Sequence, residues 1–293
     1  VYFFFFLKEK NMLRSIPNSN SNYNPLVSYP ASPIKTHLNF KNFVSKPYNI
    51  QYQALNVLQE VQQGQVLLGL KNNNFQQGSK VVDLKGGARP VIVLSSTEAI
   101  AQTRVVMLAP LSTQKIKHPF EVYLPKSESG LAEDSKIMTN QIFTLKLDRL
   151  NPSKKTATVG QETICSIHKG LKITLSNKFK KNEAGILSRG DIVLSEIKER
   201  IGIVISNNLN NLKAEIIMVL YCEVNSIKKN TLESEVDAIW ADNSNFQDSK
   251  LIVSCNHIET VDQGIVKSIG VVPERAMATI DTLTWESLGF ENQ

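Results

Sequence analysis

The sequence predicts a mainly β protein with terminal helices, built from two small, curled, SH3-like barrels in tandem. Three blocks recur along the chain, and Arg89 and Arg200 are 111 positions apart while Asp134 and Asp248 are 114 apart. The blocks are ARPVIVLS (88–95) with ERIGIVIS (199–206), VVMLAPLST (105–113) with AEIIMVLYCEV (214–224), and DSKIMTNQIFTLKLDRL (134–150) with DSKLIVSCNHIETV (248–261). A near-constant offset indicates a duplicated domain, and 293 residues suffice for two domains of about 110 residues each.

The elements follow from local pattern. Helical spacing predicts a lead-in helix over 52–61 and a closing helix through Ile164, Ile167, Leu171 and Leu175. Short apolar runs between Gly, Pro and Asn predict strands at Val66–Leu70, Val91–Ser95, Val105–Leu108, Phe120–Leu124, Ser135–Thr139 and Ala157–Val159. The second copy repeats this order and ends in a helix that starts near Pro273 and stops near Gly289.

The predicted boundaries are a leader at 1–50, a first domain at 62–176, a linker at 177–187 and a degenerate acidic domain at 188–293. The leader is rich in Asn, Ser and Pro and shows no sustained period, so we expect it to be mobile. A signal peptide carries a basic segment ahead of its apolar stretch, and the run VYFFFFLKEKN has none. We expect the natural start of the protein at Met12.

Charge separates the two copies. Residues 62–176 carry 15 Lys and Arg against 8 Asp and Glu, whereas residues 186–293 carry 9 against 16. A basic domain beside an acidic one indicates a polyanion site in the first. Three dispersed cysteines argue against disulfides or a zinc site, and no apolar run is long enough to span a membrane. We therefore expect a cytoplasmic protein.

The first copy contains seven blocks in order: G-x-V, R-P-x-x-V-L-S, A-P-L-S-T, H-P-F-E-V, G-L-x-x-D-S, Q-I-x-T-L-x-x-x-R-L and V-G. With these blocks the region 62–176 resembles the MazF/PemK toxin family. The resemblance implies a metal-independent endoribonuclease of a type II toxin–antitoxin pair, in which the ribose 2′-oxygen attacks the adjacent phosphorus of single-stranded RNA. It also implies an acidic antitoxin partner and a homodimer, here replaced by an intramolecular pseudo-dimer if the two copies pair.

By this resemblance Arg89 is the catalytic arginine, since a guanidinium pairs with phosphate and stabilises developing charge. Ser112 lies where the family has a catalytic hydroxyl, and Thr113 beside it is the substitute. No metal and no cofactor is expected. The simpler interpretations are a solvated arginine before proline and ordinary turn chemistry.

Groups expected to bind substrate come from two loops and one strand end. They are Lys85, Gly86 and Gly87 in the long basic loop 71–88, Lys115, Lys117 and His118 after the A-P-L-S-T block, and Gln141. Asp134–Ser135 recurs in both copies, so we interpret it as a structural turn. Family members often have Arg where this chain has Phe143; we expect Phe143 in the core, with stacking on a base as the alternative.

The second copy keeps Arg200, but Glu223 and Val224 stand at the offset of Ser112 and Thr113. A carboxylate there would repel a phosphate, so we expect one working site. The acidic segment 231–249 is interpreted as a solvated surface loop with one buried Trp, or as a cover for the first site. Two other functions stay open: a catalytically inactive nucleic-acid- or protein-binding module of the same fold, and a gyrase-directed toxin.

Overall fold

The computed structural model describes residues 61–70, 89–150, 154–175, 187–195, 199–208, 211, 215–241, 246 and 249–290. The predicted leader 1–50, the loop 71–88 and nearly all of the lead-in helix and of the linker lie outside these residues. Residues from Pro47 to the end group into one compact unit. Within the described part, no helix is both long and apolar enough to cross a membrane.

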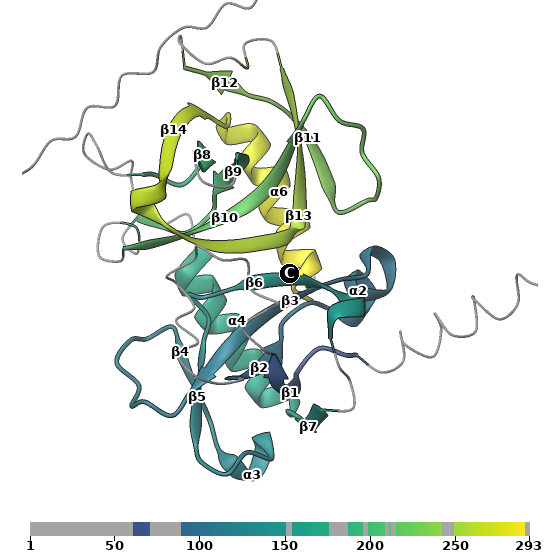
Figure 1. The fold of residues 1–293 in the computed structure, drawn as a ribbon, viewed down its shortest axis with the longest axis vertical. Helices are drawn as coiled ribbons and strands as arrows, with labels where there is room; N and C mark the ends of the chain where they lie inside the picture. The colour runs from purple at the N-terminus through teal and green to yellow at the C-terminus, as the bar shows by residue number, and fades with distance from the viewer. Residues whose placement is uncertain are drawn as a thin grey trace, which may run out of the picture. The chain divides into compact units, whose positions relative to one another are not determined.

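The first half is a curled antiparallel sheet of seven strands in the order β4-β5-β3-β2-β1-β7, with β6 paired to β3 (Figure 1). The strands are β1 (Gln65–Leu70), β2 (Arg89–Val93), β3 (Val105–Ser112), β4 (Glu121–Leu124), β5 (Ser135–Met138), β6 (Phe143–Lys146) and β7 (Lys155–Thr158). Two short helices, α2 (Thr97–Thr103) and α3 (Lys126–Ser129), lie in its connections, and α4 (Gln161–Leu175) closes the half.

The second half repeats this order as β11-β13-β10-β9-β8-β14-β12. Its strands are β8 (Asp191–Ser195), β9 (Arg200–Val204), β10 (Ile216–Val224), β11 (Glu233–Asp237), β12 (Ile239–Trp240), β13 (Lys250–Asp262) and β14 (Val266–Val271), followed by α6 (Glu274–Ser287). Strand β13 takes the place of both β5 and β6, because it pairs with β10 where those two pair with β3. The tandem β-barrel prediction is confirmed.

Matching backbone features underlie the repeat. Gly64 and Gly190 precede the first strand of each half with φ of 78° and 90°, a region that favours glycine. Their N–H groups donate to Val93 O at 2.9 Å and to Val204 O at 2.8 Å. In both halves a buried serine hydroxyl, of Ser95 or Ser206, accepts from the backbone N–H of the methionine 12 positions on.

The main core is shared by the two halves. One cluster of buried apolar side chains includes Ile92, Met107 and Leu171 together with Ile203 and Met218. A second cluster on the other face of the first sheet contains Val91, Val93, Leu108 and Phe143 among others. Because burial of apolar surface is the dominant stabilising term, the halves are expected to fold as one unit.

Reciprocal hydrogen bonds join the halves. Thr144 Oγ1 on β6 donates to Ile258 O at 2.7 Å, and Thr260 Oγ1 on β13 donates to Ile142 O at 2.8 Å. A second reciprocal set uses backbone groups: Ser96 N donates to Ser287 O and Asn207 N to Thr174 O, both at 2.9 Å. Such i-to-j and j-to-i contacts are the mark of a two-fold interface, here formed within one chain.

Two sequence expectations about elements differ from the structure. Strand β6 and helices α2 and α3 were not predicted. The segment 231–249 is not a solvated loop, because β11 runs through it with Leu232, Ser234 and Val236 buried. Its acidic Glu235 contacts Lys250 on the neighbouring strand of the same sheet.

Candidate functional site

Arg89 and Ser112 stand at the same end of neighbouring strands. Arg89 opens β2 and Ser112 ends β3, and both are half-buried. The strands pair Val91 with Pro110 and Val93 with Leu108. Arg89 and Ser112 each lie two residues beyond the Val91–Pro110 pair, at the same end of these two strands.

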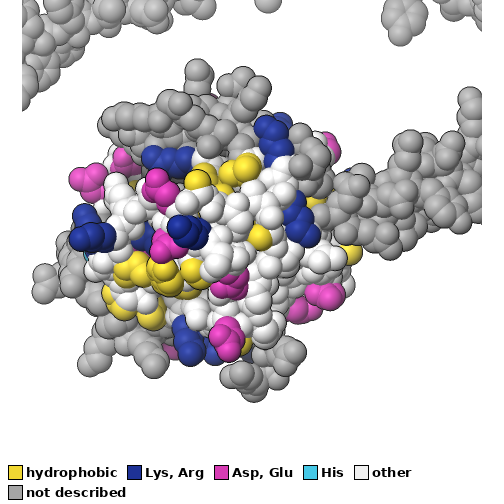
Figure 2. All heavy atoms as spheres, turned by 90° about the horizontal axis from the view of Figure 1, so that it is seen from below, with side chains coloured by type: hydrophobic (Ala, Val, Ile, Leu, Met, Phe, Trp, Pro, Cys, Tyr) yellow, Lys and Arg dark blue, Asp and Glu magenta, His cyan; other side chains and the backbone are white. Residues whose placement is uncertain are grey.

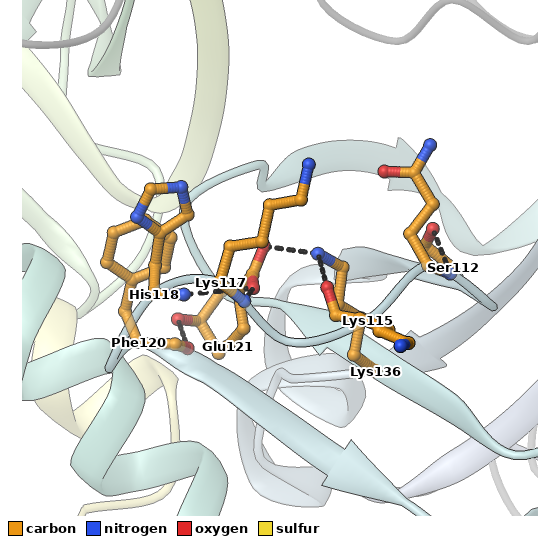
Figure 3. Close-up of polar contacts among 9 residues, drawn as sticks. Ser112, Lys115, Lys117, His118, Phe120, Glu121 and Lys136 are labelled. Carbon is orange, nitrogen blue, oxygen red and sulfur yellow. Dashed lines mark hydrogen bonds and ion pairs between the residues drawn. The ribbon is translucent and has the colours of Figure 1, made fainter.

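The loop from Thr113 to His118 leaves β3 directly after Ser112 (Figure 3). Thr113, Lys115, Lys117 and His118 are all exposed. Ser112 Oγ accepts from Gln114 N at 3.3 Å, which leaves the hydroxyl hydrogen available to another acceptor. The His118 ring stacks on Phe120 with centroids 5.0 Å apart. Lys115, Lys117 and His118 therefore follow the serine along one exposed loop.

A buried ion pair holds this loop from below. Lys136 Nζ on β5 donates to Glu121 Oε1 at 2.5 Å and to Lys115 O at 3.1 Å, and both charged side chains are only 4% exposed. Glu121 Oε2 accepts from the backbone N–H groups of Lys117 at 2.6 Å and His118 at 3.2 Å. Burial alone raises the pKa of Glu121, but these donors and the Lys136 charge together bring it below its ordinary value.

The remaining predicted site residues separate into three groups. Gln141 is half-buried in the turn between β5 and β6, with its N–H donating to Met138 O at 3.0 Å. Phe143 is 8% exposed in the second core cluster, which supports the core interpretation of this departure. Lys85, Gly86 and Gly87 lie outside the described residues.

The described residues contain no cluster of three or more His, Cys, Asp or Glu side chains that could bind a metal ion. Cys222 and Cys255 are buried free thiols, and burial raises the pKa of Cys255 to about 12. A thiol with so high a pKa is a poor nucleophile at neutral pH.

In the second half Arg200 begins β9 as Arg89 begins β2. Its guanidinium lies 4.8 Å from the centre of the Tyr221 ring and 3.6 Å from Glu259 Oε1. Glu259 also lies 3.4 Å from His257 Nε2, and the His257 ring stacks on Tyr221. The arginine that matches Arg89 is thus held by a carboxylate and an aromatic face of its own half.

Glu223, at the place of Ser112, is engaged as well. Its carboxylate accepts from Lys229 Nζ at 2.8 Å and from Ser226 Oγ at 2.6 Å, and these contacts lower its pKa. Lys229 therefore balances the charge that was expected to repel a phosphate. The second half has Glu223 where the first half has the hydroxyl of Ser112.

Charge on the molecular surface is mixed where it can be seen. In the view of Figure 2, Lys and Arg side chains alternate with Asp and Glu around small apolar areas. The excess positive charge of the first half is thus not gathered on this face of the described surface.

A comparison with protein families finds one model over the first half, described as PemK-like, MazF-like toxin of type II toxin–antitoxin system, matching residues 63–175. Residues 63–175 are a PemK-like, MazF-like toxin domain. The match contains Arg89, Ser112 and the loop to His118. No curated protein matches the chain.

Solved structures similar to the PemK-like domain include an endoribonuclease in complex with its cognate antitoxin from Mycobacterial species, with 22% identity, 41% of this chain and 99% of that chain covered, and a TM-score of 0.32. Another is a MazE–MazF complex from Deinococcus radiodurans, with 15% identity, coverage of 36% and 98%, and a TM-score of 0.31. At these identities and TM-scores the neighbours say nothing about the chemistry of this chain.

Proposed function

We propose that the chain is the toxin of a type II toxin–antitoxin pair and that its PemK-like domain is a metal-independent, sequence-selective endoribonuclease acting on single-stranded RNA. The observation that carries this proposal is the shared strand end of Arg89 and Ser112, with the exposed Lys115–His118 loop beside it. The family match over 63–175 supports the reaction class.

The reaction forms a bond between the ribose 2′-oxygen and phosphorus and breaks the bond from phosphorus to the 5′-oxygen. Its products are a 2′,3′-cyclic phosphate and a 5′-hydroxyl. Arg89 stabilises the negative charge that grows on the non-bridging oxygens, and the Ser112 hydroxyl donates a hydrogen bond to one of them. The 2′-hydroxyl loses its proton as the new bond forms, and the 5′-oxygen gains one as it leaves. His118, in the loop after Ser112, carries an imidazole that can take part in this proton transfer.

Lys115 and Lys117 hold the RNA backbone on either side of the scissile phosphate. Both side chains are exposed, so each can reach a phosphate without an unfavourable loss of hydration. Each phosphate contact steepens the dependence of log affinity on log salt concentration by about 0.7 for a single strand. The affinity for RNA is therefore expected to fall as the salt concentration rises, with the shallow slope that a few phosphate contacts produce.

The chain has one working site, in the first half. In the second half Glu223 stands where the hydroxyl is needed. The second half then serves as the pseudo-dimer partner that shares the core and the reciprocal threonine contacts. An acidic antitoxin is the expected protein partner, acting in the cytoplasm on the basic first half.

The core position of Phe143 removes one reason to prefer an inactive binding module, and no described feature favours gyrase as the target. The experiment that tests the proposal uses purified full-length chain and a long single-stranded RNA in EDTA. Cleavage with 5′-hydroxyl and cyclic phosphate ends is expected. Bound but intact RNA would support the inactive module instead.

A further inference from the structure

A carboxylate holds the loop after the third strand in both halves. Glu121 Oε2 accepts from Lys117 N at 2.6 Å, and Glu233 Oε2 accepts from Lys229 N; each acid is four residues beyond its donor. Glu121 pairs with Met138 on β5 as Glu233 pairs with Ser254 on β13. The two halves therefore share one device, which is a buried carboxylate that collects backbone N–H groups of the loop.

Among the described residues, a buried ammonium joins this carboxylate in the first half alone. Lys136 is 3% exposed and lies on β5 directly across from Ser112. The corresponding partner of Glu223 on β13 is Ile252, also buried. There the second carboxylate oxygen of Glu233 receives the Asn230 side-chain amide at 3.0 Å instead.

Stability alone does not account for this lysine. Replacing a buried ion pair by apolar residues is often neutral or stabilising, since the desolvation of two charges offsets their attraction. The second half shows the same sheet with isoleucine at this position. Lys136 connects the strand to the loop, because this residue pairs with Ser112 across the sheet and its Nζ donates to the carbonyl of Lys115 (Figure 3).

We propose that the Lys136–Glu121 pair is a positioning device that fixes the loop Thr113–His118 against Ser112, and that the fixed loop determines which bases flanking the scissile phosphate are accepted. Lys136 and Glu121 act through the loop and do not touch the RNA. This inference rests on the proposed ribonuclease function. The substrate class is unchanged; the pair sets sequence preference within it.

The test compares the full-length chain with Lys136→Met and with the double variant Glu121→Gln/Lys136→Met. The double variant removes both buried charges, so it keeps the test usable if the single variant fails to fold. Lys126→Met is the control, since it removes one exposed lysine of the same half, on α3. Cleavage is measured on an RNA pool with randomised sequence, and the ratio of the best-cut site to the next is scored.

The ratio is expected to fall by about tenfold in both pair variants, as when a bound base loses a defining contact, and to stay unchanged in the control. A merely structural role would lower cutting at all sites equally and leave the ratio intact, which would overturn the inference. Amide exchange at Lys117 and His118 supplies an independent readout, and both N–H groups should exchange faster without Lys136.

Failure of the proposed function looks different. If the wild-type chain cuts no RNA, the ribonuclease assignment fails, and amide exchange still reports whether Lys136 fixes the loop. The positioning role itself would be contradicted if the Lys117 and His118 amides exchanged rapidly in the wild-type chain. It would also be contradicted if Lys136→Met left their exchange rates unchanged.

Discussion

Loss of the two threonine hydroxyls between the halves should destabilise the whole unit. Thr144→Val and Thr260→Val each keep the side-chain shape but remove an O–H donor to a carbonyl of the other half. Removing one partner of a buried hydrogen bond costs about 1–2 kcal/mol. Thr260 is 6% exposed and Thr144 is half-buried, so the larger loss is expected for Thr260.

The double variant should lose about 3 kcal/mol, which corresponds to a fall in Tm of roughly 6–12 °C for a unit of this size. Calorimetry of the full chain measures it, and one cooperative transition is expected because both halves share a core. Thr282→Val is the matched control: its hydroxyl donates to Ala278 O within α6 on the exposed face, so a change within about 0.5 kcal/mol is expected. Two separate transitions, or interface variants no worse than the control, would refute the pseudo-dimer.

Two further predictions concern the second half and pH. Phe143 pairs with Leu108 in the first half as Glu259 pairs with Val219 in the second, so Glu259→Phe gives the second half the first half's side chain. The variant should release the guanidinium of Arg200 from Glu259 and steepen the salt dependence of RNA affinity by about 0.7; an unchanged slope would mean that Arg200 cannot reach RNA. His168 Nε2 lies 3.2 Å from Leu288 O, and burial lowers the pKa of His168 despite that contact. The unfolded chain then binds the proton more readily, so stability is full above the ordinary value of 6.5 and declines as pH falls below it. Denaturant unfolding at pH 7.5 and 5.5 measures the loss in free energy of unfolding between these two pH values. The loss should be smaller in His168→Gln than in the wild-type chain, and an equal loss in both proteins would contradict the prediction.

The duplication and the β class could be predicted because they depend on patterns that sequence displays directly. The offset of Arg89 from Arg200 survives as matching strand starts, and Gly64 and Gly190 precede matching strands. Helix α2 was missed because seven residues form too short a periodic stretch, although Ser96 caps it by accepting from Ala99 N.

The acidic strand shows how composition can mislead. The run ESEVD alternates acid and small or apolar residues, which is strand periodicity, yet its charge favoured a loop interpretation. Burial of Glu233 beneath its own loop, rather than solvation, accommodates part of that charge. The missed strand β6 has a counterpart in the second half, where β13 runs unbroken through the positions that β5 and β6 occupy in the first half.

The site was predictable only in part. Arg89, Ser112 and the Lys115–His118 loop came from the family resemblance, and the structure places Arg89 and Ser112 at the same end of two paired strands. Lys136 could not be found this way, since lysine is almost never fully buried without a partner and the pairing with Glu121 depends on tertiary structure. Nor could the holding of Arg200 by Glu259 be read from spacing.

The most direct measurement maps the cut ends of one single-stranded RNA, in EDTA, for the wild-type chain and four variants. Arg89→Ala and Ser112→Ala are compared with Arg200→Ala and Glu223→Ala, the residues at the same places in the second half. Cleavage that is lost by at least about 100-fold in the first two, as for removal of a transition-state contact, and retained in the second two is the predicted result. Loss in the second pair with retention in the first would reverse the assignment of the working half.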